Sequence, residues 1–119
     1  MNVGDVCISN SEPYHRLIVA ADCPHDNVLV VRITKPDRGK ETTCWIHKVE
    51  YPSLAYDSLI MYRDAIVGSR QAMIDAEVHG DFRSVEPLPA VVVARICAGL
   101  PFSRAQRRVK RFLTEECCP

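Results

Sequence analysis

The chain has 119 residues, the length of one domain, and can bury a hydrophobic core without a disulfide or a metal to stabilise it. Its 15 Lys and Arg balance its 15 Asp and Glu, which excludes a global field that would draw it to nucleic acid or to a membrane. Positive charge is concentrated only in residues 103–114, where five basic side chains stand without an acidic one. We predict a single domain over residues 1–119.

The N-terminus gives no targeting signal. No basic segment followed by a long apolar run opens the chain, and Asp5 interrupts the first apolar stretch, so we predict no signal peptide. Nowhere does an apolar run approach the roughly 20 residues that a transmembrane helix needs. The sequence therefore predicts a cytoplasmic protein that does not contact a membrane.

Short apolar, β-branched runs fill the first half of the chain. Gly, Pro, Asn or Asp interrupt them about every ten residues, which is typical of short strands joined by turns. The run 28–34 is the strongest, and it should pair with 16–21 as a hairpin. The predicted strands are 3–8, 16–21, 28–34, 43–46 and 58–62, with 65–67 as a short sixth. Strands of this number and length predict a small barrel or sandwich.

The apolar period becomes helical after residue 68. Ser69 is a suitable N-cap for the first helix and Gly80 a suitable stop, while Ser103 should cap the last helix. The basic residues of that last helix lie opposite an apolar stripe. The predicted helices are 69–78, 90–98 and 103–113.

These elements divide the chain into a barrel over 1–67, a helical part over 68–114 and a frayed tail over 115–119. The fold class is α+β, a small barrel of five to six mostly antiparallel strands with two or three C-terminal helices.

Six cysteines are many for this length, but none forms a C-x-x-C pair, and disulfides are rare in a cytoplasm. We interpret Cys7, Cys44 and Cys97 as small buried hydrophobes, because each lies in an apolar run. The pair Cys117-Cys118 falls in the predicted tail. A zinc site from Cys7, Cys23, Cys44 and a histidine is an alternative that lacks paired-ligand spacing.

Polar side chains suited to chemistry gather in the stretch 43–67, at the ends of its two apolar runs. They are His47, Asp57, Ser58, Tyr62, Arg63 and Asp64. Loops at strand ends commonly expose functional side chains held by a rigid scaffold. No His-Asp partner for a nucleophilic serine can be identified from the spacing, so Asp57-Ser58 is interpreted as a side-chain-to-backbone turn.

Several short blocks spread over nearly the whole chain match the order of blocks in a known family. They are Val-Gly-Asp-Val at 3–6, Arg-Leu-Ile-Val at 16–19 and Val-Val-Arg-Ile-Thr at 30–34. These resemble the G-D-[IV], R-P-x-[LIV]-V and V-P-[IV]-T blocks of PemK/MazF-type toxins, which are bacterial plasmid-maintenance and stress toxins. The block 51–62 and the basic ending 108–113 are similar to blocks of short bacterial proteins related to those toxins.

The resemblance implies an SH3-like barrel that forms a homodimer, with a cleft that binds single-stranded RNA and cuts it without a metal or another cofactor. In that reaction the 2′-hydroxyl attacks the adjacent phosphate, which requires a base, an acid for the leaving oxygen and a cation for the phosphorane charge. A toxin of this kind also implies an antitoxin protein as partner.

Two positions match the family's site residues. The resemblance makes Arg16 the phosphate-facing cation and Thr34 a hydroxyl that bonds a phosphate oxygen. Met61 stands where some family members place a catalytic Arg, and Arg63 and Asp64, at the end of the same strand, are the candidates to replace it. The predicted catalytic residues are therefore Arg16, Thr34, Arg63 and Asp64.

Aromatic, histidine and arginine side chains near these positions are candidates to bind RNA. Aromatic rings stack on unpaired bases, and histidines titrate near neutral pH and could act as acid or base. The predicted RNA-binding residues are Tyr14, His15, Arg32, His47 and Tyr62. Arg32 and Leu17 both stand where the family blocks have Pro.

A second hypothesis stays open beside the enzyme. The chain could be a non-catalytic interaction module that kept the barrel and lost the active site, with the segment 51–62 and the basic helix as contact surfaces. That helix also allows contact with RNA phosphates, with an acidic partner, or only with solvent.

Overall fold

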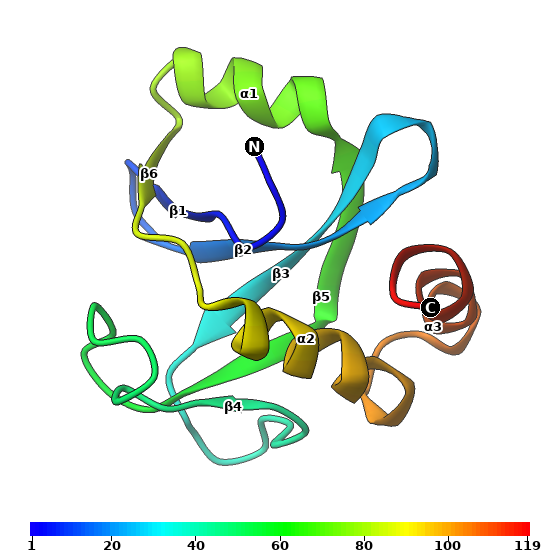
Figure 1. Cartoon of the computed structure of the whole chain (residues 1–119). Helices are drawn as coiled ribbons and strands as arrows, with labels where there is room; N and C mark the ends of the chain where they lie inside the picture. The colour runs from blue at the N-terminus through cyan, green and yellow to red at the C-terminus, as the bar shows by residue number, and fades with distance from the viewer.

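The computed structural model describes residues 1–119 and shows one curled sheet of six antiparallel strands with three α-helices (Figure 1). The strand order is β4-β5-β3-β2-β1-β6. The strands are β1 (Val6–Ser9), β2 (Arg16–Cys23), β3 (Asn27–Thr34), β4 (Trp45–Ile46), β5 (Ser58–Ser69) and β6 (Phe82–Val85). Because β4 and β6 are not paired with each other, the sheet is a half-barrel. The predicted α+β class with a small barrel-like sheet is confirmed.

The central hairpin forms as predicted. β2 and β3 pair from Arg16↔Ile33 to Cys23↔Asn27, with a bulge at Ala20. The short 3-10 turn η1 (Pro24–Asp26) reverses the chain, and its residues His25 and Asp26 take left-handed φ angles of 64° and 56°. Both strands are buried over most of their length, which agrees with their continuous apolar sequences.

β5 is longer than predicted, because the runs 58–62 and 65–67 belong to one strand. The register between β5 and β3 changes between the pairs Arg32↔Met61 and Val30↔Ile66. From one pair to the next, β5 covers five residues and β3 only two. The extra residues of β5 form a bulge that holds Arg63 and Asp64. A bulge of this kind bends its strand and redirects side chains.

The sixth strand lies inside the predicted helical part. β6 pairs antiparallel with β1, from Val6↔Val85 to Ser9↔Phe82. Four residues with two exposed polar side chains at their centre carry too weak a pattern to be recognised without the partner strand. β1 is shorter than the predicted 3–8, because Gly4 has a φ of 95° and turns the chain before the strand begins.

Two of the predicted helices are confirmed, α1 (Arg70–Val78) and α2 (Ala90–Gly99). The Ser69 hydroxyl accepts a hydrogen bond from the backbone N–H of Ala72 at 3.2 Å, as an N-cap does. Gly80, with a φ of 85°, follows the end of α1. These local signals are sufficient to place α1.

The last helix differs from the prediction. α3 (Arg107–Phe112) begins four residues after Ser103, whose buried hydroxyl instead donates to the carbonyl of Leu100 at 2.7 Å. The π-helix η3 (Leu113–Cys117) continues it to the end of the chain, and Leu113 and Cys117 are buried. The predicted frayed tail is therefore wrong for most of its length.

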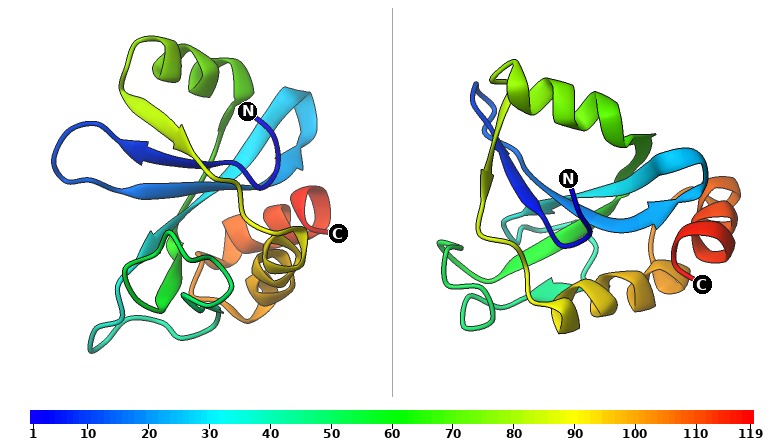
Figure 2. Two further views of the ribbon diagram at one scale, coloured as in Figure 1. Left: turned by 60° about the vertical axis from the view of Figure 1, so that its left-hand side comes forward. Right: turned by 45° about the horizontal axis from the view of Figure 1, so that its top comes forward.

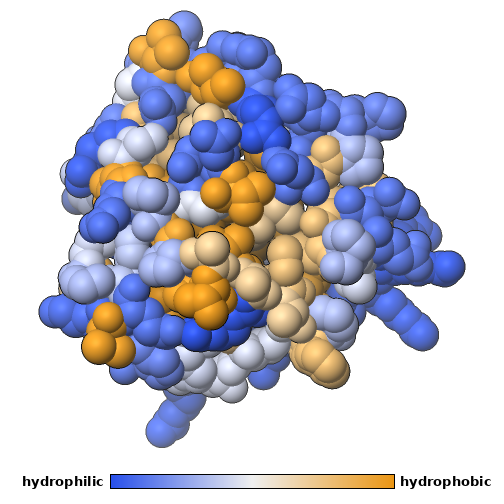
Figure 3. Space-filling model, viewed as in Figure 1, coloured by the Kyte–Doolittle hydropathy of each residue, from blue (hydrophilic) through white to orange (hydrophobic).

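The core lies on the concave face of the sheet, where α2 and η3 cover it (Figures 1 and 2). Val92, Val93 and Ile96 of α2 and Leu113 of η3 pack in this cluster with strand residues such as Tyr62. A second, smaller cluster of Val19, Val28 and Val30 contacts Met73 of α1 on the opposite face. In the view of Figure 3, apolar side chains gather over the middle of the molecule, bordered by hydrophilic ones.

The cysteines are partly as predicted. Cys7 and Cys44 are free and buried, and burial raises the pKa of both thiols. Cys97, however, is bonded to Cys118, and Cys23 to Cys117. Their Cα atoms lie 5.3 Å and 4.6 Å apart, within disulfide range. Partners 21 and 94 residues apart give no spacing pattern that a sequence reading could use.

None of the helices has the length and apolar character that crossing a bilayer requires.

Candidate functional site

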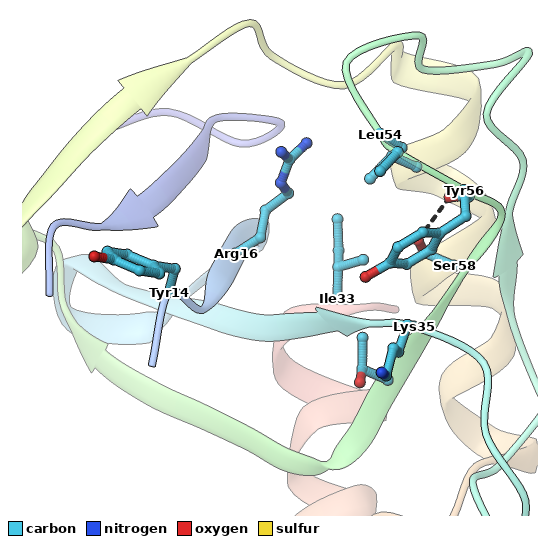
Figure 4. Close-up of a pocket in the computed structure, with 9 residues that line it drawn as sticks. Tyr14, Arg16, Ile33, Lys35, Leu54, Tyr56 and Ser58 are labelled. Carbon is cyan, nitrogen blue, oxygen red and sulfur yellow. Dashed lines mark hydrogen bonds between the residues drawn. The ribbon is translucent and has the colours of Figure 1, made fainter. Parts of the chain in front are cut away.

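A pocket of about 180 Å³ opens where β2 begins and β3 ends. The loop before β5 forms its other wall, so three separate segments build it. The lining residues are Tyr14, Arg16, Ile33, Thr34, Lys35, Leu54, Ala55, Tyr56 and Ser58 (Figure 4). We call it the Arg16 pocket. Two of its walls belong to the paired strands β2 and β3. The third wall is the loop, which is anchored by its buried side chains Tyr51 and Leu54.

Arg16 is the central cation of this pocket. Its guanidinium extends from β2 toward the loop, as Figure 4 shows, and its Nη1 donates to the Ser53 hydroxyl at 3.1 Å. No carboxylate pairs with Arg16 or with Lys35, and no acidic side chain lines the pocket. Two cations without counter-charges favour an anionic ligand such as a phosphate.

Two tyrosines at this pocket are exposed. Tyr14 is 64% and Tyr56 49% exposed, large fractions for aromatic side chains. Figure 4 shows the Tyr56 ring lying across the pocket from Arg16, while the Tyr14 hydroxyl points away from it. Exposed rings next to cations are what single-stranded nucleic acid binders use to stack bases along a backbone.

Thr34 also lines the pocket, and its hydroxyl oxygen accepts a hydrogen bond from Nζ of Lys40 at 2.7 Å. The hydroxyl proton remains free to donate to a ligand oxygen. The structure therefore brings Arg16, Thr34 and Tyr14 together at one pocket.

Arg63 and Asp64 lie elsewhere. In the sheet, Arg16 is opposite Ile33, whereas Arg32 is opposite Leu17 on one side and Met61 on the other. Neighbouring residues of a strand face opposite sides, so Arg32 lies on the convex face and Arg16 on the concave one. Arg32 Nη2 forms an ion pair with Asp64 Oδ2 at 2.7 Å. The predicted catalytic set is thus divided between two places. Arg63 shares the convex face with Met61 by the ordinary alternation of a strand, and the bulge in β5, invisible in the sequence, brings Asp64 to the same face.

His47 has a partner that the sequence reading missed. Its Nδ1 lies 3.4 Å from Oδ2 of Asp57, and its ring is parallel to that of Trp45 with centroids 6.3 Å apart. The backbone N–H of Lys48 donates to Asp57 at 2.8 Å. This bond has the largest effect on the pKa of the Asp57 carboxyl and the bond to His47 the second largest, and both lower it. The nine residues between His47 and Asp57 fold back so that the two side chains meet, which their spacing in the sequence did not reveal.

Neither member of this His47–Asp57 pair lines the Arg16 pocket, although Asp57 lies in the chain between Tyr56 and Ser58, which both do. A carboxylate that orients an imidazole is a common arrangement for a general acid or base. His15 stands on the other side, next to Tyr14, and its side chain makes no hydrogen bond or ion pair within the chain.

Tyr62 cannot stack on a base. It is 1% exposed, and its hydroxyl donates to the carbonyl of Ile96 in α2 at 2.6 Å. Burial raises the pKa of this phenol, so it stays neutral. Tyr62 is a core residue, and we leave it out of the site.

The zinc alternative also fails on geometry. Cys23 is bonded to Cys117, and no group of three or more His, Cys, Asp or Glu side chains lies close enough together to hold a metal ion.

No known protein family, curated protein or solved structure matches the chain. Its resemblance to PemK/MazF-type toxins remains a prediction from the sequence blocks.

Proposed function

We propose that the chain is a toxin-like protein that binds single-stranded RNA at the Arg16 pocket. The observation that carries the proposal is the pairing of two cations that lack counter-charges, Arg16 and Lys35, with two exposed tyrosines. RNA offers both complements, since phosphates suit the cations and unpaired bases suit the rings.

Within this proposal the pocket is a candidate for metal-independent cleavage of RNA. Arg16 would stabilise the charge on the phosphorane, and Thr34 would donate its free hydroxyl proton to a phosphate oxygen. His47, oriented by Asp57, flanks the loop that forms one wall of the pocket and is our candidate to move a proton between the 2′-hydroxyl or the leaving 5′-oxygen and solvent. Arg63 and Asp64 do not enter this scheme, since they lie on the convex face.

A direct test is incubation of the purified protein with single-stranded RNA in chelator, followed by end-group analysis. We expect cleavage that leaves a cyclic phosphate in the wild type and none in Arg16→Ala. The matched control is Arg108→Ala, which removes the same charge from an exposed position of α3 and should cleave normally. If Arg16→Ala cleaves RNA as the wild type does, this pocket takes no part in the reaction.

A second candidate function is a non-catalytic interaction module on the same scaffold. The observation that favours it is the division of the predicted catalytic residues between the two faces of the sheet. It predicts that RNA or a protein binds without cleavage and that induced expression does not arrest growth. Under the toxin proposal, expression arrests growth in the wild type but not in Arg16→Ala.

A homodimer and an antitoxin partner belong to the toxin proposal. The two unpaired sheet edges, β4 and β6, are short, as protected edges are. Light scattering of the purified protein gives its molar mass in solution, and a monomer at the concentrations where RNA binds would exclude a cleft built from two copies.

A further inference from the structure

A second pocket, also of about 180 Å³, opens on the convex face at the bulge of β5. The loop between β3 and β4 and the segment after η2 (Leu100–Phe102) form its other sides. We call it the Arg63 pocket. Four of its seven lining residues are cations, Arg32, Lys40, Arg63 and Arg104. The other three are Gly39, Glu41 and Met61.

Glu41 is the only acid in this lining, and its oxygens are already occupied. The side chain is 3% exposed. Oε1 accepts from the backbone N–H groups of Tyr62 at 2.9 Å and Arg63 at 3.3 Å. Oε2 accepts from the N–H of Arg104 at 2.9 Å and the hydroxyl of Thr43 at 3.2 Å. Glu41 therefore fixes the backbone on two sides of the pocket and bonds none of its cationic side chains.

Three of the four cations have no anionic partner. The Arg63 side chain is exposed and makes no hydrogen bond or ion pair. Lys40 Nζ bonds only neutral oxygens, those of Thr34 at 2.7 Å and Lys35 at 3.1 Å. Arg104 Nη1 bonds only the carbonyl of Gly39, at 3.0 Å. Glu41 contributes one negative charge to the lining, so these three cations leave an excess of two positive charges at the pocket.

The fourth cation, Arg32, is only partly satisfied. Its Nη2 pairs with Asp64, but its Nε is buried and has no hydrogen-bond partner. A buried donor without an acceptor is costly and unusual in a folded protein. An oxyanion seated in the pocket would supply the missing acceptor.

We propose that the Arg63 pocket binds a phosphate group that carries two negative charges, either free phosphate or a phosphate monoester at the end of a larger molecule. Guanidinium groups match the oxygens of a phosphate in pairs, and an ammonium adds a point charge. Three cations against the one carboxylate of Glu41 leave an excess of two positive charges, which suits a dianion better than the single charge of a phosphodiester. The site does not depend on RNA binding at the Arg16 pocket, which opens on the other face. The two pockets meet at the hydrogen bond from Lys40 to Thr34, so Arg63→Ala is the variant that tests this site alone.

The test is a calorimetric titration of the full chain with inorganic phosphate, at constant ionic strength set by chloride. We expect saturable binding at one site, weakened at least tenfold by Arg63→Ala and by Lys40→Ala. The matched control Arg83→Ala removes the same charge from β6 and should bind as the wild type does. Thermal unfolding of each variant checks that it is folded.

Two results would overturn the proposal. One is the absence of saturation in the wild type. The other is an equal loss in Arg83→Ala and Arg63→Ala, which would mean that only net charge matters.

A competition experiment separates the two sources of the phosphate. A short oligoribonucleotide with a 5′-phosphate should displace inorganic phosphate if the site reads the end of a chain, and the same oligomer with a 5′-hydroxyl should not. Displacement by neither oligomer assigns the site to small phosphates. Equal displacement by both would contradict a site for a dianionic phosphate. Arg16→Ala should leave phosphate binding unchanged, so failure of the RNA proposal and failure of this one are distinguishable.

Discussion

At the scale of single residues, the ion pair of Arg95 and Glu50 ties helix α2 to the loop that walls the Arg16 pocket. The guanidinium of Arg95 donates to both oxygens of Glu50, at 2.8 Å and 2.6 Å. The backbone N–H of His47 donates to the same carboxylate at 3.1 Å. These hydrogen bonds lower the pKa of Glu50 from 4.5 to about 2, and the bonds from Arg95 have the largest effect.

This shift predicts a pH dependence of stability. The folded chain binds the Glu50 proton less readily than the unfolded chain does, so the pair contributes fully above about pH 4.5 and its contribution is lost as the pH falls toward 2. We expect Glu50→Gln to lower the free energy of unfolding at pH 7 and to flatten its decline over this range. Urea unfolding at a series of pH values measures both effects.

The control for this experiment is Glu12→Gln, at an exposed carboxyl without a hydrogen bond or ion pair. Its acid profile should match that of the wild type. If Glu50→Gln and the wild type decline in parallel from pH 4.5 to 2, the ion pair does not stabilise the fold.

At the scale of elements, the contact of α2 with β5 leaves no room for a side chain at Gly99. A Cβ built there would lie 2.6 Å from the hydroxyl oxygen of Tyr62, which is buried and bonded to Ile96. Gly99→Ala should therefore destabilise the protein by about 1–3 kcal/mol, although alanine favours a helix. Thermal or urea unfolding measures the loss.

Two further variants test the cause. Gly68→Ala, where an added Cβ meets nothing within 4 Å, should change stability little. Removing the hydroxyl with Tyr62→Phe should relieve the clash, so the double variant should lose less than the two single variants together. If the loss in the double variant equals the sum of the two single losses, Gly99→Ala does not destabilise the protein through a clash with the Tyr62 hydroxyl.

How much of each element the sequence revealed depends on how local its signals are. The cap Ser69 and the stop at Gly80 are neighbours of the helix they delimit, and α1 was placed within one residue. β6 has no such signal, because its four residues are held by hydrogen bonds to β1, more than 70 residues earlier. The two disulfides were not predicted for the same reason, because each joins cysteines that are not neighbours in the sequence.

The same distinction between local signals and contacts of distant segments applies to the candidate site. Arg16 and Thr34 end neighbouring strands of one predicted hairpin, so the sequence could bring them together. Arg63 and Asp64 were assigned to the same cleft by their place at the end of the predicted strand. Arg63 lies on the convex face by alternation from Met61, and the bulge brings Asp64 to that face as well. A register slip reverses the face of every following side chain, and no sequence pattern marks it here. The His47–Asp57 pair was missed because it depends on the fold of one loop.

At the scale of the whole molecule, two disulfides fasten the last turn of the chain to the core. Cys117 is bonded to Cys23 at the end of β2, and Cys118 to Cys97 in α2. They hold η3 and the basic helix α3 against the sheet. Disulfides of this kind are typical of oxidising compartments, whereas the sequence predicts a cytoplasmic protein. In a reducing cytoplasm this anchoring would be lost, so the redox state of the surroundings decides the stability of the C-terminal part.

The lengths of the enclosed loops predict how much each bond contributes. Cys23 and Cys117 are 94 residues apart, and Cys97 and Cys118 only 21. A longer loop loses more unfolded-state entropy when it is closed, so each bond should contribute about 2–4 kcal/mol, the first about 1 kcal/mol more than the second. We expect the double variant Cys23→Ala with Cys117→Ala to unfold at lower urea concentration than Cys97→Ala with Cys118→Ala. Reductant should lower the midpoint of the wild type below both, whereas a midpoint unchanged by reductant would mean that packing of Leu113 alone holds the C-terminus in place.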